Sequence, residues 1–405
     1  MFKFSMDYQK ILNYLFIGLA FSLPVSKAGV SLFEILIILV WAIEGNWKVR
    51  FQEYSSSKVI MTLFMFISLL IISLFWAKDL LEGIAYIGKY WHFLIILVLF
   101  TELKKEYIPV LISSFLSGVF LCEVVSYGIF FEIWKYKDVL PTDPSPFMDH
   151  ISYSVFLAFT AMILLCRIFS EFDSKKKFIY ILLLISVTTN LFLNGGRTGQ
   201  VAFIVALIVL TFLNTKEKVK AVFISMLALV VILSTAYVLS PNFNLRITQF
   251  VTSIDKIYVE NKYNSSTGIR LSLWIMGLDE ITDSISVGNG IGNEMINLEH
   301  YAKKHGFPID DYAVYSDHHN MFITYGVLLG QLGLIILIGL FYLIFTLKIE
   351  DPLYGNLNKV FITIFALWSF TGITFHAMDP MTLFVFFVGL FNAMSHNLKK
   401  RFSKN

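Results

Sequence analysis

Long apolar runs recur along almost the whole chain of 405 residues. A helix needs roughly 20 apolar residues to cross the hydrocarbon core of a bilayer, where every backbone polar group must be satisfied internally. Twelve runs are candidates, although several are short, and they lie near residues 11–25, 28–44, 58–77, 83–100, 107–133, 150–170, 177–194, 199–213, 219–239, 320–347, 357–375 and 381–396. The sequence therefore predicts an all-α, polytopic membrane protein with about 12 transmembrane helices.

The composition supports this fold class and excludes others. Hydrophobic residues make up 57% of the chain and charged residues only 15%, whereas soluble domains usually carry about 25% charge. A net charge of +3 gives no reason to expect nucleic-acid binding. The two cysteines, Cys122 and Cys166, lie inside apolar runs, so we expect buried packing residues and no disulfide framework.

The distribution of basic residues predicts an orientation. If the N-terminus is cytoplasmic, the cytoplasmic segments contain 20 of the 32 Lys and Arg residues, as expected from the enrichment of basic residues in cytoplasmic loops. Both termini are then inside. The chain divides into transmembrane helices 1–9 (residues 1–239), a large, partly helical loop outside the cytoplasm (240–319), and transmembrane helices 10–12 with a cytoplasmic tail (320–405).

Catalytic residues of such a protein are expected at one boundary between water and lipid, and the outer boundary contains an unusual arginine. Arg197 follows Gly195 and Gly196 in the short connection at 194–198. Glycines allow a tight turn and close approach of a ligand to the backbone, and a guanidinium group offers a planar fork of donors suited to phosphate. The competing interpretation is an arginine that only anchors a helix end at the membrane surface.

A second outer arginine, Arg270, lies in the long loop. A Ser/Thr/Gly-rich stretch at 265–268 precedes it, and Leu271, Trp274, Leu278 and Ile281 follow at helical spacing, which predicts a helix that rests on the membrane or covers the spans. An arginine in the first turn opposes the helix dipole. It is therefore either held for an anionic partner or is an ordinary solvated loop residue.

The glycine-rich stretch at 288–292 follows that helix. Such a stretch can cradle phosphate, but no strand precedes it and no long apolar helix follows it. As a dinucleotide-binding motif it is weak, and a flexible turn is the better interpretation.

The long loop closes with Asp-His-His-Asn at 317–320, directly before the tenth apolar run. A histidine at this boundary can act as a general base, because its ordinary pKa lies near 6.5. Adjacent residues make a poor tetrahedral ligand set, and His300 and His305 add no ligand-type spacing. We therefore expect no metal and no cofactor. The following run contains Gly326, Gly330 and Gly333, which predicts close helix packing.

Other ionisable residues near the spans are weaker candidates. Lys89 lies within the fourth apolar run, where a charge needs a partner or a ligand. Asp149 and His150 begin the sixth run, and His376 and Asp379 precede the last one. Residues in such positions more often cap a helix or line a crevice than take part in chemistry.

These motifs together resemble the O-antigen ligase and polysaccharide polymerase family of bacterial envelope enzymes. The most specific element is His319-Asn320, followed after nine residues by Gly330-Gln331-Leu332-Gly333, which is similar to the ligase signature of the family. The stretch at 194–199 stands where the family has a short outer loop with an essential arginine, although the family more often has Ser before that arginine than Gly196. Arg270 with Trp274 looks like the second arginine element, in the large periplasmic loop.

The resemblance implies an enzyme of the bacterial inner membrane whose active site faces the periplasm. Such a ligase transfers a glycan from undecaprenyl pyrophosphate to a sugar hydroxyl of lipid A-core, with inversion and without metal. The resemblance implies that Arg197 and Arg270 bind the donor pyrophosphate and that His319 is the catalytic base. Lys89, Asn320, His318 and Asp317 are implied as supporting residues. The expected partners are the lipid-linked donor, the lipid A-core acceptor and membrane lipids, without nucleic acid.

Three alternatives remain. A polysaccharide polymerase or a protein O-oligosaccharyltransferase uses the same donor with a different acceptor, and the His319-Asn320 signature favours the ligase. A lipid or glycan transporter predicts repeated halves and polar residues at the middle of the membrane. Here the polar residues gather at the outer boundary, which argues against transport.

Overall fold

The computed structural model describes residues 7–283, 287–292, 295–308 and 317–402, and within these ranges the regular elements are all helices. A helix forms at each of the twelve apolar runs, which confirms the predicted all-α class. In the transmembrane part before the long loop, the elements are α1 (Tyr8–Val25), α2 (Lys27–Glu44), α3 (Trp47–Ser55), α4 (Lys58–Ile72), η1 (Ser73–Trp76), α5 (Leu80–Gly88), η2 (Lys89–Phe93), α6 (Leu94–Glu102), η3 (Lys105–Tyr107), α7 (Ile108–Phe130), α8 (His150–Ser170), α9 (Ser174–Leu193), α10 (Arg197–Asn214) and α11 (Lys218–Leu239).

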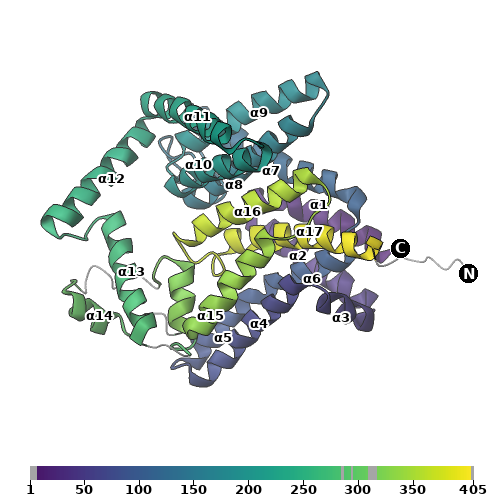
Figure 1. Cartoon of the computed structure of the whole chain (residues 1–405), viewed down its shortest axis with the longest axis horizontal. Helices are drawn as coiled ribbons and strands as arrows, with labels where there is room; N and C mark the ends of the chain where they lie inside the picture. Colours follow the sequence, from purple (N-terminus) through teal and green to yellow (C-terminus); the bar gives the residue numbers. More distant parts are fainter. Residues whose placement is uncertain (1–6, 284–286, 293–294, 309–316, 403–405) are drawn as a thin grey trace, which may run out of the picture.

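The described part of the predicted outer loop forms α12 (Pro241–Glu260), α13 (Ser266–Asp283) and α14 (Leu298–His305). Its residues 284–286, 293–294 and 309–316 lie outside the described part of the chain. The chain continues with α15 (Met321–Phe345), α16 (Pro352–Ser369) and α17 (Met378–Phe402). Figure 1 shows α12, α13 and α14 at one end of the molecule, and α3 and the end of α17 at the other.

Eight helical segments in the described chain are long and apolar enough to cross a membrane, or up to ten if each of two sharply bent helix pairs is one span. One bent pair joins α2 to α3 at 113°. Neither α1 nor α16 is among these segments, because polar residues such as Asn13 and Asn358 interrupt them. The molecule is therefore a multi-pass membrane protein, and the full count of 12 spans remains a prediction.

The centre of the bundle is formed by α8, α15, α16 and α17. In α17, 94% of the apolar window is buried inside the protein, compared with 22% in α9, which lies at the periphery. Phenylalanine rings fill this centre, and the Phe159 ring lies 5.0 Å from that of Phe361 and 4.7 Å from that of Phe387. Lipid supplies no hydrophobic force between helices, so close ring packing of this kind is what holds them together. Cys122 and Cys166 are buried free thiols, as predicted.

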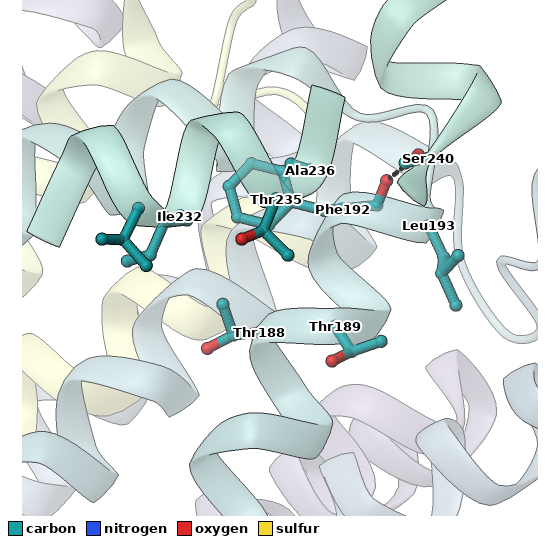
Figure 2. A pocket seen from close by; sticks show the side chains of 9 residues that line it. Thr188, Thr189, Phe192, Leu193, Ile232, Thr235, Ala236 and Ser240 are labelled. Atoms are coloured by element: carbon teal, nitrogen blue, oxygen red, sulfur yellow. Dashed lines mark hydrogen bonds between the residues drawn. The ribbon is translucent and has the colours of Figure 1, made fainter. Parts of the chain in front are cut away.

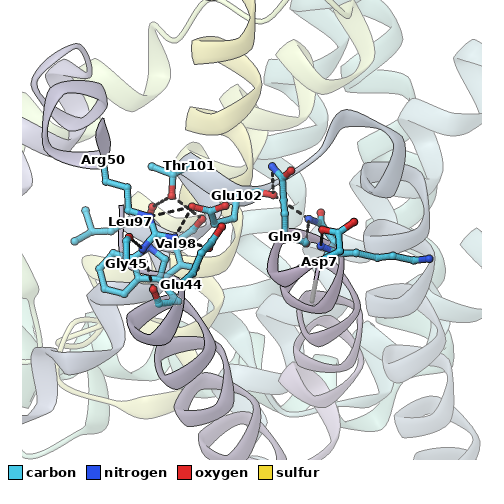
Figure 3. A network of polar contacts seen from close by, with 12 residues as sticks. Asp7, Gln9, Glu44, Gly45, Arg50, Leu97, Val98, Thr101 and Glu102 are labelled. Carbon is cyan, nitrogen blue, oxygen red and sulfur yellow. Dashed lines mark hydrogen bonds and ion pairs between the residues drawn. The ribbon is translucent and has the colours of Figure 1, made fainter. Parts of the chain in front are cut away.

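A buried polar network fastens α2, α3 and α6 at the end of the bundle where α3 lies (Figure 3). The guanidinium of Arg50, 3% exposed, donates to Glu102 Oε1 at 3.0 and 3.1 Å and to Glu44 Oε2 at 2.6 Å. It also donates to the carbonyls of Trp41 and Gly45. The sequence suggests only a cytoplasmic loop arginine here, whereas the structure shows the residue that closes the bend between α2 and α3.

We expect Arg50→Ala to lower the stability of the folded protein by about 3–5 kcal/mol, because it leaves the buried Glu102 carboxylate and the half-buried Glu44 carboxylate without their cation. The measurement is thermal unfolding of the purified protein in detergent, with Lys48→Ala, an exposed residue of the same helix, as the control. Equal melting temperatures for the two variants would contradict the assignment.

Candidate active site

The first turn of α15 presents the Asp-His-His-Asn segment. Asn320 caps the helix, because its side chain accepts hydrogen bonds from the backbone N–H groups of Phe322 at 3.0 Å and Ile323 at 3.2 Å. The preceding residue, His319, has a φ of +48°, a conformation that is costly outside glycine and often occurs at functional sites. Asp317 holds it there, since Asp317 Oδ1 accepts from the His319 backbone N–H and lies 3.7 Å from His319 Nδ1.

His318 points into the protein, with 3% of its surface exposed. Its Nε2 lies 3.9 Å from Glu280 Oε2, on α13. Burial raises the pKa of Glu280, and its Oε1 accepts from Asn289 at 2.6 Å and Asn297 at 2.5 Å. Burial also lowers the pKa of His318 to about 4, so His318 is neutral near pH 7. The neutral ring packs against α13, where a Cβ atom on Gly277 would lie 2.6 Å from His318 Cδ2.

The glycine-rich turn at 287–292 binds to a break in α15. Gly330 has a φ of +67° inside this helix, and carbonyls next to such a break lose their usual donors four residues later. The backbone N–H groups of Asn289 and Gly290 donate to the carbonyls of Val327 and Leu328, both at 2.9 Å. These hydrogen bonds hold the turn in place, so it is not the flexible turn that the sequence suggests. Gly330, one of the glycines predicted to allow close helix packing, instead creates the break in α15.

Arg270 lies on α13, which forms where the sequence predicts a helix. Ser265 caps it, because its Oγ accepts from the Gly268 N–H at 3.1 Å. Arg270 is in the second turn and not in the first as predicted, since the helix begins at Ser266. Of the predicted apolar residues, Ile281 packs against α15 together with Gly277, while Leu271 and Leu278 are exposed.

Arg197 is the first residue of α10, and the turn before it is held by several polar contacts. The Gly195 N–H donates to Asp143 Oδ1 at 3.0 Å, and the Gly196 N–H donates to Asn194 Oδ1 at 2.7 Å. Gln200 donates from α10 back to the Asn194 carbonyl at 3.0 Å. These contacts fix the position of the helix start and with it the origin of the Arg197 side chain.

The glycine before Arg197 is required by packing against α8. A Cβ atom at Gly196 would lie 2.3 Å from the carbonyl oxygen of His150 and 2.3 Å from Ser154 Oγ. The sequence alone suggests that the glycines allow a tight turn and the approach of a ligand. In the structure the neighbour that approaches Gly196 is α8, and this contact sets the distance between α8 and α10.

The two predicted arginines lie near each other and near a third. Arg197 interacts electrostatically with both Arg246, on α12, and Arg270. Arg270 in turn interacts with His319. A Cβ atom on Gly195 would lie 3.4 Å from Arg246 Nη2 and 3.1 Å from Asp143 Oδ2. Sequence reasoning missed Arg246, because nothing in the sequence distinguishes it from a solvated loop residue.

The environment of His319 favours the neutral imidazole. Burial lowers its pKa below the ordinary value of 6.5, and the positive charge of Arg270 acts in the same direction, while Asp317 opposes them. Near pH 7 the ring can therefore accept a proton, as a general base must.

A second polar cluster connects η2 to the segment before α17. Lys89 Nζ lies 2.7 Å from His376 Nε2, so Lys89 has the partner that its place in a span requires. Burial and the Lys89 charge lower the pKa of His376 to about 4, which leaves its ring neutral to accept from the ammonium group. The His376 ring also stacks on Tyr86 at 4.3 Å.

The other ionisable candidates make local structural contacts. Asp149 caps α8 by accepting from two backbone N–H groups, as anticipated for such a position. His150 Nδ1 lies 3.4 Å from Asp143 Oδ2, and Asp379 Oδ2 lies 3.2 Å from Lys27 Nζ. His305 pairs with Asp279 at 2.8 Å. Among the described residues, no three side chains suited to a metal ion converge.

An apolar cavity of about 210 Å³ lies beside the Arg197 turn. Figure 2 shows that α9 and α11 line it, with Leu193 and Ser240 toward one side. Ser240 Oγ donates to the Phe192 carbonyl at 2.7 Å and connects the two helices. Leu193 directly precedes the turn at 194–196, so the cavity adjoins the segment that carries Arg197.

Comparison with known proteins identifies this part of the chain. Residues 179–338, which include all three arginines and His319, match the family described as O-antigen ligase. This stretch belongs to the O-antigen ligase family. The family match supports the activity of O-antigen ligases and polymerases in general, in a multi-pass membrane protein acting on lipid-linked glycans. A search of curated proteins finds no match to the chain.

We expect Gly196→Ala to lower the stability of the protein by about 1–3 kcal/mol, because the added methyl group overlaps the α8 backbone. Thermal unfolding in detergent measures the change. Gly339→Ala is the matched control, since a Cβ atom there meets nothing within 4 Å. If both variants melt like the wild type, α10 does not lie against α8 as described.

Proposed function

We propose that the protein is an O-antigen ligase, which transfers a glycan from undecaprenyl pyrophosphate to a sugar hydroxyl of lipid A-core on the periplasmic face of the inner membrane. The observation that carries this proposal is the arrangement of Arg197, Arg270 and His319. Arg270 lies within electrostatic range of both other residues, although the three come from separate segments of the chain.

The arginines suit the leaving group of the reaction. Guanidinium groups from α10 and α13 lie close enough to interact, and such like charges repel unless an anion lies between them. Pyrophosphate is such an anion, and arginine binds its oxygens with paired, charge-assisted hydrogen bonds. Holding the developing negative charge lowers the barrier to departure of the lipid pyrophosphate.

His319 provides the base for the attacking hydroxyl. The acceptor O–H bond gives its proton to the neutral imidazole, and the acceptor oxygen forms a bond to the anomeric carbon. The bond from that carbon to the phosphate oxygen breaks, and undecaprenyl pyrophosphate leaves. Direct attack of this kind inverts the anomeric centre, and these residues carry it out without a metal ion.

The neighbouring residues have supporting roles in this proposal. Asp317 fixes the backbone of His319 by accepting its N–H, and Asn320 fixes the start of α15. His318 packs the segment against α13 at Gly277. In this proposal Lys89, which lies beside His376, contacts the donor, and the cavity beside the Arg197 turn takes the first isoprenoid units of the donor.

Replacing His319, Arg270 or Arg197 by alanine should abolish most transfer. Loss of a positioned base costs about 10²–10⁴-fold, and loss of one electrostatic donor costs about 10²–10³-fold. The measurement is transfer in vitro, with purified protein, undecaprenyl-pyrophosphate glycan, lipid A-core and a chelator.

Two matched variants control for the loss of an arginine or a histidine as such. Arg167→Ala removes an arginine from the end of α8 that lies far from Arg197, and His300→Ala removes an exposed histidine of α14. Both should retain transfer. Full activity of His319→Ala would end its assignment as the base, and longer carrier-linked chains without transfer to the core would identify a polymerase.

The rate at low donor concentration should fall as the pH drops through the pKa of His319, because protonation removes the base. Burial and Arg270 place this pKa below 6.5, so activity persists at pH 6.5 and is lost below it. Asp317→Asn removes the group that raises this pKa and should move the acid limb to lower pH. A shift to higher pH would show that Asp317 does not act on His319 in this way.

A further inference from the structure

A polar cavity lies at the end of α15 opposite to His319. Its volume is about 500 Å³, and its wall includes Lys58, Lys348, Asn392 and His396. His319 directly precedes the start of α15, whereas the cavity is lined by the residues at the end of this helix, beyond the break at Gly330. It is therefore a separate site, and binding of a ligand there does not depend on the proposed transferase activity.

Three candidate spans have one of their two ends at this cavity. The span Lys58–Trp76 begins there, Met321–Phe345 ends just before Lys348, and Met378–His396 ends at His396. Residues at the ends of spans lie at the level of the lipid headgroups. The cavity is thus at the depth where the phosphate of a phospholipid lies.

The charges at the cavity favour an anion. Lys58 and Lys348 contribute two ammonium groups, and an adjoining cavity of about 400 Å³ shares Lys348 and adds Lys359. Acidic groups also lie nearby: Glu53 Oε2 is 3.9 Å from His396 Nε2, and Glu350 and Asp351 follow Lys348 in the chain. Lysines at helix ends keep their ammonium groups at the interface, where they attract anionic lipids.

A buried amide adds a donor to the wall. Asn392 is 2% exposed, and its Oδ1 accepts from Ser57 Oγ at 3.1 Å. Its Nδ2 has no hydrogen-bond partner within the described part of the chain. Ser57 also caps the start of α4, where the helix dipole favours negative charge. A buried donor without a partner is costly, and a phosphate oxygen would relieve that cost.

We propose that this cavity binds the phosphate-bearing headgroup of an anionic phospholipid. The lysines neutralise the phosphate, the Asn392 amide donates to it, and the acyl chains lie along the exposed apolar surface of α15, which includes Ile338 and Tyr342. In the predicted orientation this is the cytoplasmic leaflet. A lipid bound at this site anchors the C-terminal end of α15. His319 lies at the opposite, N-terminal end of the same helix.

The test is native mass spectrometry of the full chain in detergent, titrated with phosphatidylglycerol or with phosphatidylcholine of the same chains. We expect the wild type to prefer phosphatidylglycerol and Lys58→Gln/Lys348→Gln to bind it about 25-fold more weakly, from about fivefold for each lysine. Asn392→Asp, nearly the same size, should also weaken binding by adding a negative charge.

The control is Lys175→Gln/Lys176→Gln, which removes the same charge from an exposed stretch of α9 and should bind like the wild type. Equal loss in the control would reduce the effect to net charge and overturn the site. Inorganic phosphate in place of lipid distinguishes the sources of the ligand. Displacement of phosphatidylglycerol by equimolar phosphate, or equal binding of phosphatidylcholine, would also overturn the lipid assignment.

Discussion

The break in α15 is the constraint on which the arrangement of the outer segments depends. Gly330 interrupts a helix that is long enough to span the membrane, and lipid offers no donor to the carbonyls that the break releases. The turn at 287–292 supplies those donors, and its Ile291 is fully buried. Because this turn follows α13 and precedes α14, the break fixes the outer helices to the bundle.

This docking explains how Arg270 and His319 come within range of each other. α13 packs on α15 through Gly277, where an added Cβ atom would lie 2.6 Å from His318 Cδ2. Glu280 then joins α13, the turn and α14 through Asn289 and Asn297. An outer helix that carries an arginine is thus held at a fixed distance from the helix that carries the histidine, which transfer between two bound substrates requires.

The sequence predicts which segments are helical but not how distant segments meet. Apolar runs identify a helix at each of twelve positions, and the Asn320 cap follows from an asparagine before an apolar run. Lys89 and His376 are 287 positions apart, and no local pattern reveals their contact. Periodicity also does not show which apolar residues of α13 meet the bundle, because lipid or protein can cover an apolar residue.

The candidate site shows the same limit. Arg197, Arg270 and His319 can be found because glycines, a helix start and a signature motif surround them in the sequence. Arg246 has no such surroundings, and only the path of α12 brings its guanidinium to within 3.4 Å of a Cβ position on Gly195. Asp143 lies beside the same glycine and accepts its N–H. Several cations gather around one turn, with a carboxylate at its edge. Their mutual repulsion makes this arrangement unfavourable when the site is empty, and a bound anion with several charges makes it favourable. The electrostatic cost in the free protein thereby becomes a preference for a multiply charged anion over a singly charged one.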